Sequence, residues 1–170
     1  RVSESLRNIH ITFSLNETTR FFETYLNGEN VEEKIRSLRI ANNVSEVSRL
    51  SVVRELMVEK QRVIGRDKGI VMDGRDIGTV VFPEAELKIF MTADFEVRAQ
   101  RRYEELCEQG VSITLDEVKD NLRQRDEMDS NRTVSPLNQA EDALVLDTSD
   151  MTKDEELAWV CSVVDERMNV

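Results

Sequence analysis

A segment near residue 70 limits what this chain can fold into more than any other feature of its sequence. Gly69 to Pro83 reads GIVMDGRDIGTVVFP, so a short apolar run gives way to an acid, an arginine and a second acid around Gly74. The run Ile70–Met72 is apolar on both faces, which is typical of a strand in a parallel sheet covered by helices. Charges at the carboxyl end of such a strand lie where open α/β sheets bind ligands. We predict a binding loop here, in which Gly74 and Gly78 let the backbone turn and approach a ligand closely.

The same alternation of short apolar runs and helical patterns continues toward the end of the chain. Leu87–Met91 and Leu144–Leu146 are predicted strands, and Asp94 is placed to cap a helix that reaches Glu108. Two capping boxes predict further helix starts: Thr114 with Glu117, and Thr152 with Glu155. This order of elements favours an α/β class.

The first part of the chain has a different pattern. Ile9–Leu15 alternates apolar and polar residues, and Thr18–Leu26 is rich in threonine and aromatic residues, so both are predicted strands. Asn27-Gly28 is a turn signal, after which Val31 opens a third short strand. We therefore predict a small antiparallel β-meander. A long helical stretch, Glu33 to Ile64, follows it and is predicted to break near Asn42-Asn43.

Composition excludes several classes of function. The 170 residues carry a net charge of −11, which argues against the broad basic surface that nucleic-acid binding needs. No apolar run approaches the roughly 20 residues of a membrane span, and no signal peptide is visible. Cys107 and Cys161 lack metal-ligand spacing, His10 joins no recognisable site, and a reduced cytoplasmic protein is the simplest interpretation.

One helix changes from apolar to charged along a single face. Leu115, Val118 and Leu122 form its buried stripe, and Arg125, Asp129 and Arg132 continue the same face. A solvated ladder of salt bridges is the alternative to a binding site at the rim of the core.

Two stretches of the sequence resemble the bacterial cytidylate (CMP) kinases. These are Asp73–Pro83, DGRDIGTVVFP, and Arg125–Leu137, RDEMDSNRTVSPL, and they fall in the family's order. Ser45 and Arg54 match the family's base-binding serine and arginine. The resemblance implies an α/β fold of the P-loop NTPase-like nucleoside monophosphate kinase type, with a parallel sheet, flanking helices and a small antiparallel meander. It also implies a nucleotide-monophosphate-binding insert over residues 1–41 and a partial core over residues 42–170, with a lid at about 101–132.

The resemblance assigns a role to each candidate residue. Cytosine carries an amino donor at N4 and acceptors at N3 and O2. Asp76 and Ser45 would therefore take N4 while Arg54 addresses N3 and O2, and UMP would be disfavoured because its O4 faces the Asp76 acceptor. Arg75 would bind the phosphate as a bidentate fork. The remaining assignments are the ribose (Arg125 and Asp129), the lid network (Arg132, Arg98, Arg101 and Arg102), a contact to the nucleotide (Arg36) and a water of the magnesium shell (Asp73). Arg75, Arg125 and Arg132 would act in catalysis.

The reaction implied is transfer of the ATP γ-phosphoryl group to CMP or dCMP, with Mg²⁺, in pyrimidine metabolism. The sequence contains no Gly-x-x-x-x-Gly-Lys-Ser/Thr loop for the ATP phosphates. We therefore expect an additional N-terminal segment in the native gene product, an inactive chain without it, and either a rearranged sheet or association along exposed strand edges. A monomer is otherwise expected. A nucleotide-binding fragment without catalysis, a UMP or AMP kinase and a structural domain are the alternatives.

Overall fold

The computed structural model describes residues 6, 8–48, 50–131 and 136–168. They form two compact units, Arg1–Gly69 and Ile70–Val170, each of which is described by itself. The last two residues of the first unit, Lys68 and Gly69, both have a positive φ, at 59° and 64°. The compact units divide the chain after Gly69. The division predicted after residue 41 is one of function, and it stays a prediction.

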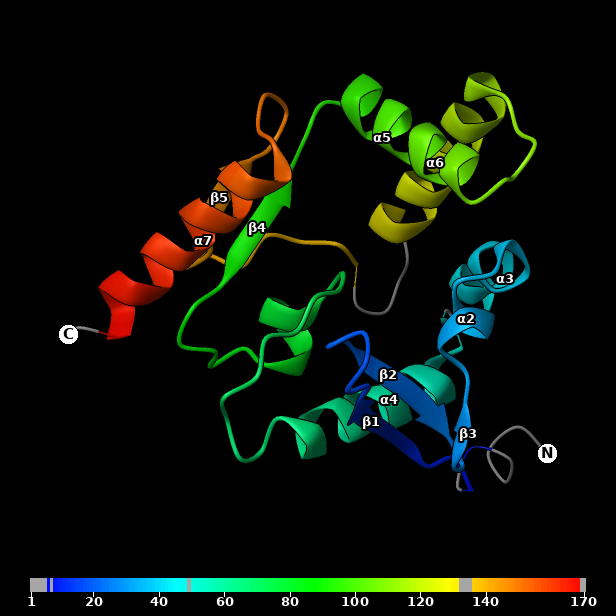
Figure 1. Ribbon diagram of the computed structural model, residues 1–170. Helices are drawn as coiled ribbons and strands as arrows, with labels where there is room; N and C mark the ends of the chain where they lie inside the picture. The colour runs from blue at the N-terminus through cyan, green and yellow to red at the C-terminus, as the bar shows by residue number, and fades with distance from the viewer. Residues whose placement is uncertain (1–5, 7, 49, 132–135, 169–170) are drawn as a thin grey trace. The chain divides into compact units, whose positions relative to one another are not determined.

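The first unit contains the predicted antiparallel meander, in the order β1 (Ile11–Leu15), β2 (Phe22–Leu26) and β3 (Glu29–Asn30) (Figure 1). Asn27 and Gly28 connect β2 to β3 with φ values of 51° and 85°. Two consecutive positive φ values are what a tight hairpin turn requires, and Asn-Gly adopts them at low cost. The predicted turn is confirmed, although β3 ends before Val31 instead of beginning there.

The helical stretch that follows breaks at different places from the predicted one. It forms α2 (Glu32–Ile35), α3 (Leu38–Ser48) and α4 (Ser51–Ile64). The prediction of a break near Asn42-Asn43 is wrong, because both residues lie inside α3. The Asn43 side-chain amide donates to the carbonyl of Arg39 at 2.7 Å, one turn back, so this asparagine bonds to the helix without ending it.

The second unit is built on a parallel strand pair, β4 (Ile89–Thr92) and β5 (Leu144–Asp147). Both strands were predicted, and they pair from Ile89 opposite Leu144 onward. Three longer helices complete the unit: α5 (Phe95–Glu108), α6 (Leu115–Asn131) and α7 (Lys153–Met168). Helices α5 and α6 lie side by side (Figure 1). The buried apolar side chains of this unit come from the segment before β4, α5, α6 and β5: Val81, Ala99, Leu106, Val118 and Leu146.

The third predicted strand of this unit, Ile70–Met72, does not form. The segment makes no ladder with any residue that the structure describes, and Val71 is fully exposed. A strand exists only where a neighbour pairs with its backbone, so an apolar run alone cannot make one. The prediction was therefore right about the hydrophobic pattern and wrong about the element.

Both predicted capping boxes are present. The Thr114 backbone N–H and hydroxyl donate to Glu117 Oε2 at 2.8 and 2.7 Å, and the Glu117 N–H donates to Thr114 Oγ1 at 3.3 Å. Thr152 and Glu155 repeat the arrangement at the start of α7. Asp94 lies at the N-cap position of α5 but its side chain makes no capping bond. Its N–H instead donates to Ser149 Oγ at 2.9 Å.

Replacing Thr114 with alanine should lower the free energy of unfolding by about 1 kcal/mol, because the N-terminal N–H groups of α6 lose their side-chain acceptor. Urea denaturation measures this change. Ser112→Ala, at an exposed position two residues earlier, is the control and should have almost no effect. Equal midpoints for the two variants would contradict the capping role.

The capping boxes should also make the free energy of unfolding depend on pH under acidic conditions. Hydrogen bonds from the Thr114 backbone and hydroxyl hold the pKa of Glu117 below its ordinary value of 4.5, and Thr152 does the same for Glu155. A carboxylate whose pKa is lower in the folded state stabilises the fold above 4.5, and that contribution is lost as pH falls through the lower, folded value. Unfolding midpoints of the wild type and of the Glu117→Gln, Glu155→Gln double variant should therefore differ less at pH 3 than at pH 6. A constant difference would contradict this linkage.

Candidate functional site

The loop after Gly74 is held by one wide helical turn, η1 (Ile77–Val81). The carbonyl of Asp76 accepts hydrogen bonds from the N–H groups of Thr79, Val80 and Val81 at 3.3, 2.9 and 3.2 Å. The turn therefore fixes the backbone of Asp76, and the side chain of this residue is only 2% exposed. Arg75, one residue earlier, is exposed at the surface of the unit.

The two glycines of this loop are explained by the side chains packed around them and not by their φ angles. Neither Gly74 nor Gly78 has a positive φ, so the predicted use of glycine for turning is wrong at these positions. A Cβ at Gly74 would lie 2.9 Å from Ile77 Cγ1, and a Cβ at Gly78 would lie 3.2 Å from Lys88 Cδ. The close approach that glycine permits here is to side chains of the same unit.

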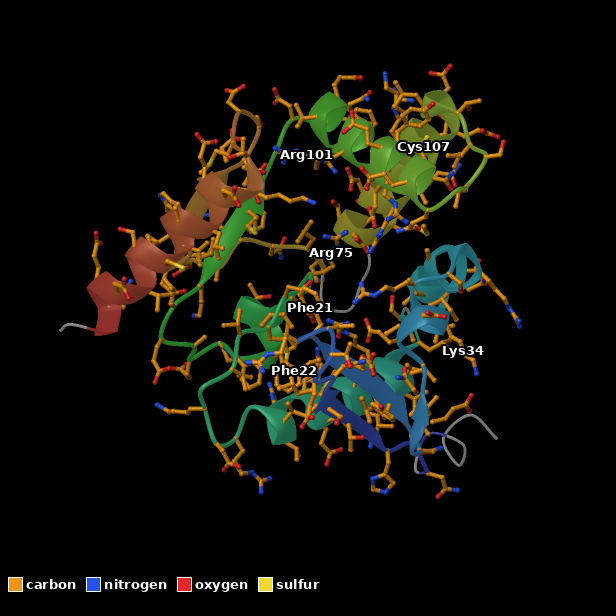
Figure 2. All side chains as sticks on the ribbon, in the orientation of Figure 1. Phe21, Phe22, Lys34, Arg75, Arg101 and Cys107 are labelled. Carbon is orange, nitrogen blue, oxygen red and sulfur yellow. The ribbon has the colours of Figure 1, made fainter. Side chains whose placement is uncertain are left out.

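The two sequence motifs meet at one buried carboxylate. Arg75, labelled in Figure 2, donates from Nε to Asp129 Oδ2 at 2.8 Å across 54 residues of sequence. Arg125 Nε lies 3.9 Å from the same oxygen. The Asp129 side chain is 8% exposed, whereas those of Arg75 and Arg125 are 42% and 47% exposed. Two cations share one anion, so the cluster of these three side chains carries one net positive charge, on the two more exposed members. Such a surface attracts a phosphate or another anion.

A third arginine adds to this positive field. Burial lowers the pKa of Arg125, the cation of Arg75 lowers it further, and Arg102 acts in the same direction, while Asp129 and Asp126 oppose the change. Arg102 itself pairs with Glu105 at 2.7 Å. The predicted lid residue Arg102 therefore lies close enough to Arg125 for their charges to interact, and an incoming anion would relieve their mutual repulsion.

The other two predicted lid arginines make different contacts. Arg98 donates to the Ala93 carbonyl at 3.1 Å and to Asp126 at 2.8 Å, and its guanidinium lies 5.6 Å from the centre of the Phe95 ring. It thus joins α5 to α6. Arg101 donates to the carbonyls of Thr148 and Met151 at 2.7 and 2.8 Å, so it ties α5 to the connection between β5 and α7 (Figure 2).

Two of the predicted base-binding residues belong to the first unit, whereas the third, Asp76, belongs to the second. Ser45 lies in α3, and Arg54 is half-buried in α4. Arg36, at the end of α2, is exposed and its Nε donates to Glu32 at 2.8 Å. In the second unit Asp73 is exposed ahead of the η1 loop, and Arg132 lies outside the described residues.

Sequence reasoning missed two residues that support the cluster. Asp126 holds Arg98, and Lys88 packs against Gly78. Lys88 carried a usable signal, because it is the one charge in the predicted strand Leu87–Met91. Asp126 lies inside the second family motif, directly after Arg125, but was given no role.

The described residues contain no group of three His, Cys, Asp or Glu side chains able to hold a metal ion. Within the same part of the chain, no helix is both long and apolar enough to cross a membrane. Cys107 and Cys161 are exposed free thiols.

Asp129→Asn should lower the free energy of unfolding by about 1–3 kcal/mol, because a hydrogen bond to a charged group is lost and two arginines are left without their shared anion. The control is Asp120→Asn on the same helix, whose ion pair with Arg123 is well exposed on both sides. That change should stay within about 0.5 kcal/mol. Urea unfolding of both variants compares them, and equal costs would contradict a structural role for the cluster.

Comparison with known proteins was consistent with these motifs. The family model described as cytidylate kinase matches residues 2–166. A cytidylate kinase of Porphyromonas gingivalis is 56% identical over 163 residues, which cover 93% of this chain and 71% of that protein. Those of Bacteroides thetaiotaomicron and Flavobacterium johnsoniae are 51% and 48% identical, covering 94% and 98% of this chain and 70% and 73% of the relatives. The chain belongs to the cytidylate kinase family.

Proposed function

We propose that this protein acts in the phosphorylation of CMP or dCMP by ATP, giving CDP or dCDP. The family membership supports the reaction class. The single structural observation that carries the proposal is the contact of Arg75 and Arg125 with Asp129, because it joins the two motifs typical of the family into one positively charged site. The acceptor nucleotide, an anion, suits that charge.

Base recognition is assigned to Asp76, together with Ser45 and Arg54. The buried Asp76 carboxylate can accept a hydrogen bond from the cytosine N4 amino group. Uracil places a carbonyl oxygen where cytosine has this amino group, so two acceptors would face each other in a site with little water. Leaving a buried acceptor in that position costs more than a lost contact at the surface, which favours CMP over UMP.

Phosphate and ribose binding are assigned to the cluster. Arg75 uses Nε for Asp129, and its two terminal nitrogens make no hydrogen bond to any described residue of the second unit. They are therefore available as a fork for the CMP phosphate. Asp129 and Arg125 would hold the ribose hydroxyls, and Arg132 would support the lid. Arg36 would contact the nucleotide after its ion pair with Glu32 breaks.

The lid arginines differ in what they can do. Arg98 and Arg102 are bonded to carboxylates, and exchanging a carboxylate for a phosphate oxygen is a small change for a guanidinium. We assign both to the phosphates. Arg101 bonds mainly to backbone carbonyls, so its proposed role is to hold the base of the lid, whose predicted range of about 101–132 begins at this residue.

ATP and Mg²⁺ are the cofactors that a kinase of this family implies. The chain contains no Gly-x-x-x-x-Gly-Lys-Ser/Thr loop, and its described residues contain no three-ligand metal group. The residues therefore do not fit the ATP phosphates, which need that loop. Asp73 keeps only the proposed contact to a water of the magnesium shell. The chemistry assigned to this chain is binding and orienting the acceptor.

Isothermal titration calorimetry of the full chain with CMP and UMP tests this proposal. The wild type should bind CMP at least about tenfold more tightly than UMP, and Asp76→Asn should weaken CMP binding by about tenfold or more, because the acceptor of the N4 hydrogen bond loses its charge. Glu84→Gln, an exposed carboxylate after the same loop, is the matched control and should bind like the wild type. Equal affinity of the wild type for CMP and UMP would overturn the assignment of Asp76.

A further inference from the structure

Lys88 is a lysine with almost no access to water. Its side chain is 9% exposed, although lysine is among the residues least often buried. The ammonium group donates to the carbonyl of Pro83 and to both carboxylate oxygens of Asp142, the latter at 2.8 Å each. An ammonium has three N–H donors, so these acceptors use all of them. The side chain is therefore held in one position.

The aliphatic part of the same side chain packs on the η1 loop. Its Cδ and Cγ would lie 3.2 and 3.4 Å from a Cβ placed on Gly78. Gly78 is the second residue of η1, and Pro83 follows the turn by two residues. One lysine therefore contacts the loop on both sides of the turn, with its methylenes at the start and its ammonium after the end.

The other end of Lys88 belongs to the rigid part of the unit. Its carbonyl accepts a hydrogen bond from the N–H of Leu144 at 2.9 Å, which extends the pairing of β4 with β5 by one step. Asp142 lies two residues before β5, so the ion pair returns to the same strand pair. Lys88 thus connects the sheet to η1, the turn whose N–H groups donate to the carbonyl of Asp76.

We propose that Lys88 is a positioning residue for nucleotide recognition, which holds η1 against β4 and so fixes Asp76 and Arg75 relative to the sheet. This inference rests on the proposed function in one respect, the assignment of Asp76 to the cytosine base. The physical reason is that Asp76 must discriminate between a donor and an acceptor on the base. A carboxylate that moves by a fraction of a hydrogen-bond length can avoid the uracil oxygen and lose that discrimination.

The test compares Lys88→Met with Lys88→Arg in the full chain. Methionine keeps most of the aliphatic packing and removes every donor, whereas arginine keeps the charge and can bond to Asp142. Lys119→Met is the matched control, because Lys119 also makes a partly buried ion pair, with Glu96 at 2.6 Å, away from the loop. Calorimetry with CMP and UMP, below the unfolding midpoints, gives the ratio of the two affinities for each variant.

Lys88→Met should weaken CMP binding more than UMP binding, because both nucleotides share the phosphate but only cytosine gains from a fixed Asp76, so the affinity ratio narrows by about tenfold. Lys88→Arg should keep part of the preference for CMP over UMP. Lys119→Met should lower the thermal midpoint without changing that preference. An unchanged ratio in folded Lys88→Met would overturn the inference. Should that variant fail to fold, Gly78→Ala, which pushes against the Lys88 methylenes, must narrow the ratio or the inference fails.

A second readout needs no ligand. Amide hydrogen exchange at Thr79, Val80 and Val81 reports how firmly η1 is held, since these amides bond to Asp76. Lys88→Met should speed exchange there and leave α6 unchanged; equal acceleration in both places would mean a purely global effect and overturn positioning. Parallel titrations of Asp76→Asn separate the two proposals. A changed ratio for Asp76→Asn with none for Lys88→Met would remove only this inference, whereas no change for Asp76→Asn would remove the assignment of Asp76 to the cytosine base.

Discussion

The second unit depends on a buried carboxylate that two arginines share. Asp129 comes from α6 and Arg75 from the loop before η1, and without their bond nothing among the described contacts would join that loop to the helix so directly. A buried carboxylate needs a cation, and a second cation nearby leaves the site positively charged. The same arrangement therefore gives structural cohesion, and under the proposed function it would also attract an anionic nucleotide. Stability and binding would then be coupled, because both use the same charges.

Backbone pairing is the second constraint, and it explains where the predicted and observed sheets differ. Leu87–Met91 and Leu144–Leu146 were predicted as strands and became β4 and β5, because each supplies the other's hydrogen bonds. Ile70–Met72 has an equally apolar pattern but pairs in no ladder with the residues that the structure describes. A hydrophobic pattern measures the tendency of side chains to be buried, whereas a strand also requires a partner for its N–H and C=O groups.

Local signals were the most predictable part of the molecule. The Asn27-Gly28 turn and the Thr114–Glu117 capping box were predicted from adjacent residues, since their hydrogen bonds span only a few positions. The break in the helical stretch was predicted wrongly, because asparagine was read as a helix breaker and Asn43 instead bonds back to its own helix. The contact between Arg75 and Asp129 was not predicted: the family resemblance assigned Arg75 to the phosphate and Asp129 to the ribose of one nucleotide.

The sequence by itself determined the α/β class, the meander, the caps and the two motifs that show the family, because these depend on neighbouring residues or on whole stretches of sequence. Only the tertiary structure decided which charges meet. It brought Arg75 to Asp129, engaged Arg101 with backbone carbonyls, and placed the Lys88 side chain against Gly78. Residue spacing along the chain contains no information about distances across 54 residues, and the strength of an ion pair depends on those distances and on burial.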